Sequence, residues 1–130
     1  MAGLGFRPLH RSVAQLAAET LQGTAGEAAG ERTWRTRWLV SVGPLVAAQS
    51  LDAASSYGLR EMNPLLASPD GRFGMKATAL KFGVIGGLVG AEALLVRKFP
   101  RSAKFFTVVN YSTAGVTTGL AVYNYRLPGR

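Results

Sequence analysis

Apolar residues form three long runs in this chain, each close to the roughly 20 residues needed to cross a bilayer core. The runs cover about 38–59, 76–96 and 105–125. Within each run, polar residues recur at helical spacing and therefore share one face of a helix. The pattern predicts an all-α, integral membrane three-helix bundle whose polar faces meet inside. A soluble helical bundle is the alternative, because the third run is rich in Thr and Asn.

The residues before the first run, 1–37, are predicted to form a cytoplasmic arm. Ser12 and Gln15 have the spacing of a capping box, and a narrow apolar stripe follows, so a short amphipathic surface helix is expected there. The segment 23–30, GTAGEAAG, is typical of a flexible linker. The arm lacks the apolar core of a cleaved signal, and an organellar transit peptide is the alternative interpretation. Residues 126–130 are predicted to form a tail.

The ends of the first run carry boundary signals. Trp34 and Trp38 suit the headgroup region of a membrane, where aromatic side chains gather. The segment 61–64, EMNP, is expected to stop the helix, because the residue before a proline is disfavoured in the helical region. The segment 68–71, SPDG, predicts a tight turn.

Two opposite charges lie inside the runs at similar depth. At about 1.5 Å per residue, Asp52 lies roughly 10 Å inside the first run and Lys81 roughly 8 Å inside the second, measured from the same side. A charge in a membrane span is costly and usually has a partner. Gln49, Ser56 and Thr117 fall near the same level or face. These five residues are predicted to form an intramembrane polar cluster.

Two further polar levels follow from the same depth argument. Glu61, Asn63 and Asn124 lie one or two turns further out and are predicted to form an outer polar lid. Glu92 of the second run matches Asn110 of the third near the other surface, which predicts an inner polar pair.

Small residues line roughly the opposite faces of the second and third runs. Gly-x-x-x-Gly spacings of this kind let helix backbones approach closely in lipid. We therefore predict that the glycine faces contact another copy of the chain or a larger complex. The helix-packing glycines are Gly83, Gly86, Gly87, Gly90, Gly115 and Gly119.

The basic residues sit at the ends of the runs. The net charge is +8, yet this placement favours anionic lipid over nucleic acid, so no nucleic-acid partner is expected. Seven basic residues flank one side of the predicted bundle and five flank the other. The positive-inside rule then predicts a cytoplasmic N-terminus and an external C-terminus.

The chain carries no catalytic or nucleotide signature. It has no Cys, which excludes thiolate metal sites and a Cys nucleophile, and its single His, His10, lies far from every run. Haem or chlorophyll ligation by His within the runs is excluded, although a carbonyl or carboxylate could still bind a pigment magnesium. The cofactor is therefore unknown. An intramembrane enzyme is disfavoured because no general base accompanies Ser55 or Ser56, apart from Lys81.

One pattern resembles a known family. The spacing Q-x-x-D-x-x-S-S over 49–56, followed by G-L-x-E-x-N-P over 58–64, resembles an uncharacterised bacterial family of short three-span membrane proteins. A Lys in the next span and an Asn at the end of the last span add to the likeness. The resemblance implies three spans, a bacterial inner membrane and a role for the matching polar residues, but no substrate.

Two functions agree with these features. The first is a non-enzymatic structural or accessory subunit of a larger or homo-oligomeric membrane complex, in which the Asp52–Lys81 pair holds helices together. The alternative is a small oligomeric transporter or channel that uses the intramembrane polar cluster. The expected partners are the lipid bilayer and either other membrane subunits or copies of the chain.

Overall fold

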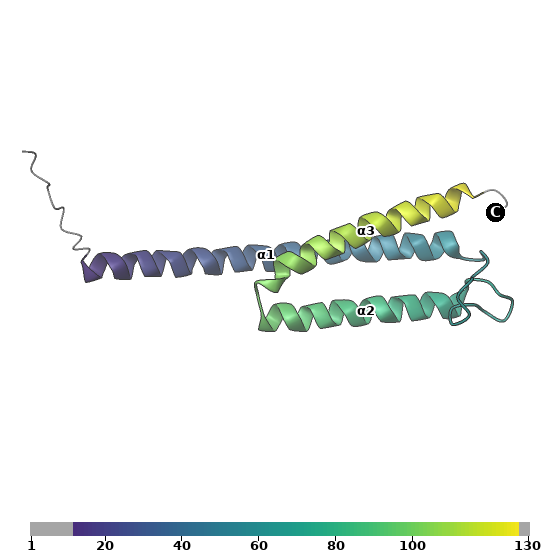
Figure 1. Cartoon of the computed structure of the whole chain (residues 1–130), viewed down its shortest axis with the longest axis horizontal. Helices are drawn as coiled ribbons and strands as arrows, with labels where there is room; N and C mark the ends of the chain where they lie inside the picture. Colours follow the sequence, from purple (N-terminus) through teal and green to yellow (C-terminus); the bar gives the residue numbers. More distant parts are fainter. Residues whose placement is uncertain (1–11, 128–130) are drawn as a thin grey trace, which may run out of the picture.

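The computed structural model describes residues 12–127, and this part of the chain holds three α-helices and no β-strand. α1 spans Val13–Ser56, α2 spans Met75–Lys98 and α3 spans Ser102–Arg126. Figure 1 shows α2 and α3 running back and forth along the C-terminal half of α1, while its N-terminal half projects beyond them. The all-α prediction with three helices is confirmed.

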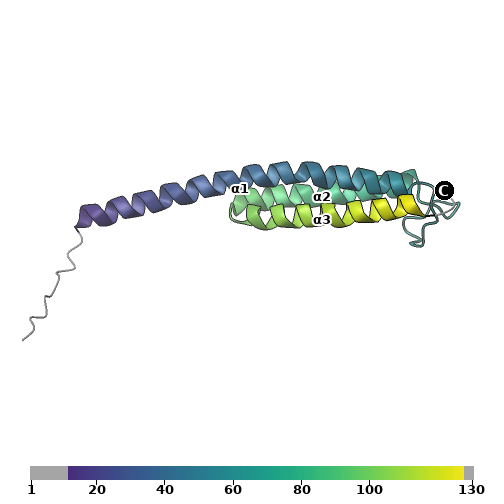
Figure 2. The same cartoon turned by 90° about the horizontal axis from the view of Figure 1, so that it is seen from above.

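The projecting half of α1 corrects the predicted arm. The capping box is present, since Gln15 N donates to Ser12 Oγ and Ser12 N donates to Gln15 Oε1, both at 3.2 Å. The predicted linker at 23–30 is wrong, however, because these residues are helical and α1 continues unbroken for 44 residues, as Figure 2 shows. Ala and Glu between the glycines are among the strongest helix formers, whereas each glycine costs roughly 1 kcal/mol relative to Ala. The rest of the predicted arm, including His10, and the tail beyond residue 127 lie outside the described residues.

The first helix ends earlier than the sequence predicts. α1 stops at Ser56, before the segment 61–64, and Gly58 then adopts φ +80, a left-handed conformation that favours glycine. Two hydrogen bonds join the start and the end of the loop between α1 and α2, from Gly58 N to Phe73 O and from Phe73 N to Leu59 O, both 2.9 Å. The turn predicted at 68–71 is confirmed by a 2.8 Å bond from its last backbone N–H to the carbonyl of its first residue.

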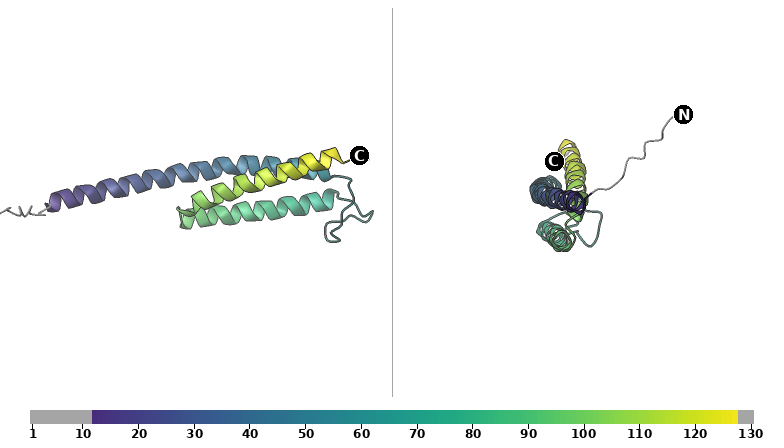
Figure 3. Two further views of the ribbon diagram at one scale, coloured as in Figure 1. Left: turned by 45° about the horizontal axis from the view of Figure 1, so that its top comes forward. Right: turned by 90° about the vertical axis from the view of Figure 1, so that its left-hand side faces the viewer.

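The three helices are packed unequally. α1 and α3 lie close along their shared length, and buried Ala48, Ala114 and Ala121 provide small side chains for this approach. α2 comes near α1 and α3 at fewer points. Figures 1 and 3 show α2 and α3 meeting at their connecting turn and then diverging. Two pockets lie between α2 and the other helices, one beside α1 and the connecting loop and the other mainly beside α3.

The interior is small and unusually polar. Two apolar clusters are present, one around Trp38 and Val96 and the other around Ala53 and Phe73. The largest fully buried side chains, by contrast, are Asn110, Ser41 and Ser55. Polar contacts therefore make up much of what connects the helices.

Only α2 among the described helices is long and apolar enough to qualify as a candidate membrane span. Its 24 residues reach a mean hydropathy of 1.8 in the most apolar window, of which 6% is buried. α1 and α3 carry polar residues such as Gln49, Asp52 and Asn110, which reduce their mean hydropathy. α2 is thus a candidate span by length and composition, and membrane crossing by any of the three helices stays a prediction.

Candidate functional site

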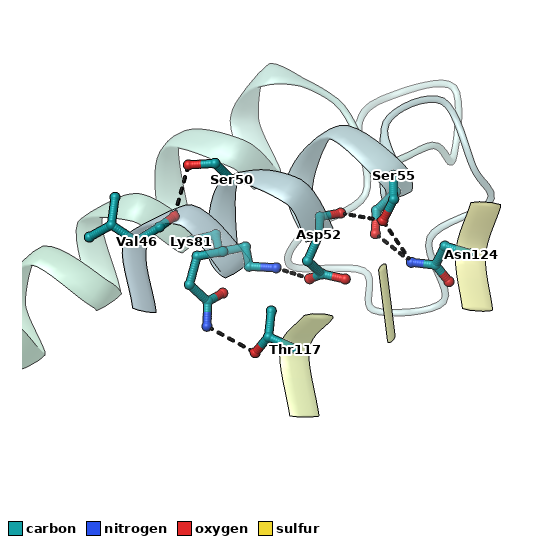
Figure 4. A network of polar contacts seen from close by, with 9 residues as sticks. Val46, Ser50, Asp52, Ser55, Lys81, Thr117 and Asn124 are labelled. Atoms are coloured by element: carbon teal, nitrogen blue, oxygen red, sulfur yellow. Dashed lines mark hydrogen bonds and ion pairs between the residues drawn. The ribbon is translucent and has the colours of Figure 1, made fainter. Parts of the chain in front are cut away.

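Asp52 on α1 and Lys81 on α2 are in direct contact. Lys81 Nζ donates to Asp52 Oδ2, and the side chains of Lys81 and Asp52 are 22% and 14% exposed, respectively. Figure 4 shows the pair reaching across from the two helices. Each charge therefore has its counter-charge in direct contact, as expected for charges inside the two runs at similar depth.

α3 contacts α1 next to the ion pair through a hydrogen bond between two uncharged side chains. Gln49 Nε2 donates to Thr117 Oγ1 at 3.2 Å, and both residues are buried. Four of the five predicted cluster residues thus form two adjacent cross-helix contacts. The fifth, Ser56, lies one turn further along α1 and bonds to a different partner.

That partner is Asn124, near the end of α3. Asn124 Nδ2 donates to Ser56 Oγ at 3.0 Å and to Ser55 Oγ at 3.3 Å, and Ser55 Oγ donates to Asp52 O at 3.0 Å. Figure 4 shows Asn124 beside Ser55 at the end of α1. Ser55 was not among the predicted cluster residues, although its neighbour Ser56 was.

The predicted outer polar lid is not a single structure. Glu61 Oε1 accepts from Asn63 N at 2.8 Å, and Asn63 Oδ1 accepts from Leu65 N at 3.0 Å. These two residues stabilise the loop locally, whereas Asn124 binds α1. A side-chain oxygen readily accepts from the backbone N–H two residues further along the chain. Asn63 makes this local bond and remains exposed, so it does not reach the helices.

Glu61, one of the predicted lid residues, lines an open pocket of about 500 Å³ together with residues of the cluster. The pocket lies between α1, α2 and the connecting loop, and Asp52, Lys81 and Glu61 line it. Gln49 and Ser56 add uncharged polar groups, and Leu80 and Val84 contribute to an apolar wall. The site can hold a small polar or zwitterionic group beside the ion pair.

A second polar site surrounds Glu92 on α2. Its Oε2 accepts from Trp38 Nε1 at 2.8 Å and from Asn110 Nδ2 at 3.0 Å. Asn110 Nδ2 also donates to Ser41 Oγ at 3.1 Å. Glu92 is 8% exposed and Asn110 is 1% exposed. The predicted inner pair is therefore in contact, within a larger network that joins all three helices.

Trp38 and Ser41 are the residues of this network that the sequence analysis missed. Trp38 was expected at the headgroup boundary, but it is 7% exposed and donates inward to Glu92. Trp38 therefore points into the bundle, and its level at the headgroup boundary stays a prediction. Trp38 and Ser41 are three residues apart and therefore share one helix face. This spacing is the feature of the sequence that indicates a common site for the two residues.

The six glycines predicted to pack helices take no part in contacts within the chain. A Cβ built at Gly83, Gly86, Gly87, Gly90, Gly115 or Gly119 would find no atom within 4 Å outside the local helix. Both glycine faces are open to the surroundings, whereas alanine and serine mediate the close approach of α1 and α3.

Residues 12–127 contain no group of three or more His, Cys, Asp or Glu side chains placed to hold a metal ion. No family model, curated protein or solved structure matches the chain. The resemblance to short three-span bacterial membrane proteins therefore stays a prediction, and the function is argued from the geometry of the two polar sites.

Proposed function

We propose that the protein is a non-enzymatic integral membrane protein, a small structural or accessory subunit of a larger or homo-oligomeric complex. The observation that carries this proposal is a reversed distribution of side chains. Polar Ser41, Gln49, Glu92, Asn110 and Thr117 are buried, whereas many large apolar residues are more than half exposed. The latter include Leu39, Val40, Val84, Leu88, Leu94, Phe105, Val116 and Leu120.

A water-soluble protein rarely exposes so many large apolar side chains while burying polar ones. A lipid bilayer removes this objection, because acyl chains solvate apolar side chains while the polar groups find partners inside the bundle. The 6% burial of the most apolar window of α2 supports the same interpretation, since the core helix of a soluble protein would be mostly covered.

The distribution of basic residues supports one orientation. Arg101, in the turn between α2 and α3, lies 3.6 Å from Glu27 and 3.9 Å from Glu31, and Lys104 lies 5.6 Å from the Trp34 ring centroid. These contacts bring the basic stretch of α1 to the basic turn, at one end of the bundle. We assign this end and the N-terminus to the cytoplasm, and the C-terminus to the outside of a bacterial inner membrane.

The open glycine rows provide the surface for assembly. Gly83, Gly86, Gly87 and Gly90 lie on α2 with no side chain of the same chain over them. Small residues let the backbone of a partner helix approach, and van der Waals contact then replaces the contact with lipid. The partner is another membrane subunit or a second copy of this chain.

Mass measurement after purification in mild detergent tests this proposal. We expect a protein mass above the 13.8 kDa of one chain, and Gly86→Leu should reduce it because the added side chain blocks close approach. Ala47→Leu, which adds similar bulk on the exposed side of α1, is the matched control and should leave the mass unchanged. A clean monomer with no co-purifying protein contradicts the subunit role.

The pocket beside Asp52 and Lys81 favours a second candidate, a small oligomeric transporter or channel. Three helices enclose too little space for a water-filled path, so several copies would have to surround it. Ion or proton flux into vesicles containing the purified protein tests this function. Equal flux for the native chain and Asp52→Asn would exclude a path through this pocket.

A further inference from the structure

The carboxylate of Glu92 uses only one of its two oxygens within the protein. Oε2 accepts both hydrogen bonds, from Trp38 and from Asn110, and no ion pair joins Glu92 to any described residue. No fully enclosed side-chain nitrogen or oxygen in the described part of the chain lacks a hydrogen bond. Oε1, which has none, must therefore be open to adjoining space.

Glu92 lines a cavity of about 290 Å³ where the three helices meet, mainly between α2 and α3. Glu92 and Asn110 line it, together with Thr113, and the rest of its wall is almost entirely apolar. The apolar side chains include Leu45, Ile85, Leu88, Leu95, Phe106 and Val109. Glu92 thus brings a carboxylate to an apolar cavity near the lower end of the roughly 300–1,000 Å³ usual for ligand sites.

The chemistry of this cavity selects its ligand. A buried carboxylate held by two neutral donors lacks the counter-charge that stabilises buried ions. Asp52, on the next polar level, has such a counter-charge in Lys81. We propose that the cavity binds a small lipophilic amine, whose ammonium group donates to Glu92 Oε1 while its apolar body lies between α2 and α3. This site goes beyond the proposed subunit role and does not depend on assembly.

Trp38 provides a direct probe of binding, because its indole donates to the other oxygen of the same carboxylate. The chain has two tryptophans, so Trp34→Phe leaves Trp38 as the only one. The full chain carrying Trp34→Phe is purified in non-ionic detergent and titrated with 4-phenylbutylamine. The uncharged analogue pentylbenzene has the same shape and serves as the ligand control. We expect a saturable change of Trp38 fluorescence with the amine, and at least tenfold weaker binding of pentylbenzene.

Glu92→Gln separates the charge from the packing. The Gln side chain keeps an oxygen that can accept from Trp38 and Asn110, but it presents an uncharged amide to the cavity. Binding of the amine should weaken at least tenfold. Glu27→Gln, the same change on the exposed projecting half of α1, should leave binding unchanged.

Val109→Phe provides a second variant if Glu92→Gln fails to fold. It adds bulk at the wall of the cavity without touching the carboxylate or its donors, and it should weaken amine binding as well. The proposal is overturned if the amine gives no saturable change with the folded protein. Equal binding of the amine and pentylbenzene, or unchanged amine binding in both Glu92→Gln and Val109→Phe, would also overturn it.

Discussion

At the scale of single residues, the two buried acids differ in how their charge is balanced. Asp52 contacts a lysine, whereas Glu92 contacts an indole and an amide. Removing one member of a buried ion pair leaves an uncompensated charge, which costs more than removing both. The two polar sites therefore respond differently to substitution.

We expect Asp52→Asn and Lys81→Met each to lower the free energy of unfolding by about 2 kcal/mol, because each strands the partner's charge. The double variant should lose less than either single variant. Reversible denaturation in mixed detergent measures all three values. Additive losses in this cycle would show that the contact does not couple the two residues energetically.

Asn110 and Asn124 form a second comparison of residues. Each amide donates to two acceptors across helices, but Asn110 is buried and Asn124 is only half-buried. Asn110→Ala should cost about 2 kcal/mol of unfolding free energy, because Ser41 and Glu92 lose a donor that water cannot replace. Asn124→Ala should cost less than half as much. Equal losses in the same denaturation assay would contradict this ranking.

Sequence alone identified most of these residues by depth and helical phase. The contacts of Asp52 with Lys81, Gln49 with Thr117 and Glu92 with Asn110 follow from pairing polar levels on adjacent helices. Depth could not reveal that Trp38 points inward, because an aromatic residue at the start of a run suits both the interior and the boundary. Nor could depth show that Glu61 and Asn63 bond within the loop while Asn124 bonds to α1, because these partners depend on the path of the loop.

At the scale of elements, the projecting half of α1 depends on local propensity. Its residues 13–30 are almost all exposed, and its ion pairs with Arg101 are solvent-exposed, so they add little stability. The three glycines at 23–30 are typical of a flexible linker, whereas the Ala and Glu residues between them favour helix. The linker prediction relied on the glycines and was wrong, since the segment is helical.

Gly26→Ala should strengthen this part of α1, since a Cβ there meets no neighbouring atom. The expected gain is about 0.5–1 kcal/mol in local helix stability. Amide hydrogen exchange across residues 13–37 should slow, while exchange in α2 and α3 should stay the same. Unchanged exchange around residue 26 would mean that this segment is not helical in solution.

Gly58→Ala tests the end of the same helix. With φ +80, residue 58 has a conformation that alanine adopts at a cost of about 1 kcal/mol. We expect global unfolding free energy to fall by that amount. Gly26→Ala, the same change inside the helix, should not lower it. A neutral Gly58→Ala would indicate a different path for the connection between α1 and α2.

At the scale of the whole molecule, polar groups inside and apolar groups outside form one consistent pattern. The three apolar runs predicted three helices, and the bounds of the second and third runs were within three residues of α2 and α3. The first run missed the start of α1, which begins 25 residues earlier because the helix extends beyond its apolar part. The arrangement of the helices was less predictable. The Gly-x-x-x-Gly spacings predicted which helix faces stay open, but they did not predict that α1 and α3 pack against each other. Buried alanine and serine residues lie on these two helices.

Single-cysteine labelling tests the membrane-embedded arrangement most directly, and the chain has no native Cys to interfere. Cysteines at Thr33, Met62, Gly86 and Val116 are introduced one at a time and exposed to a membrane-impermeant maleimide in intact cells and in lysed ones. We expect Met62→Cys to react from outside, Thr33→Cys only after lysis, and Gly86→Cys and Val116→Cys in neither case until detergent is added. Rapid labelling of Gly86→Cys and Val116→Cys without detergent, or reaction of Thr33→Cys and Met62→Cys from the same side, would contradict the account.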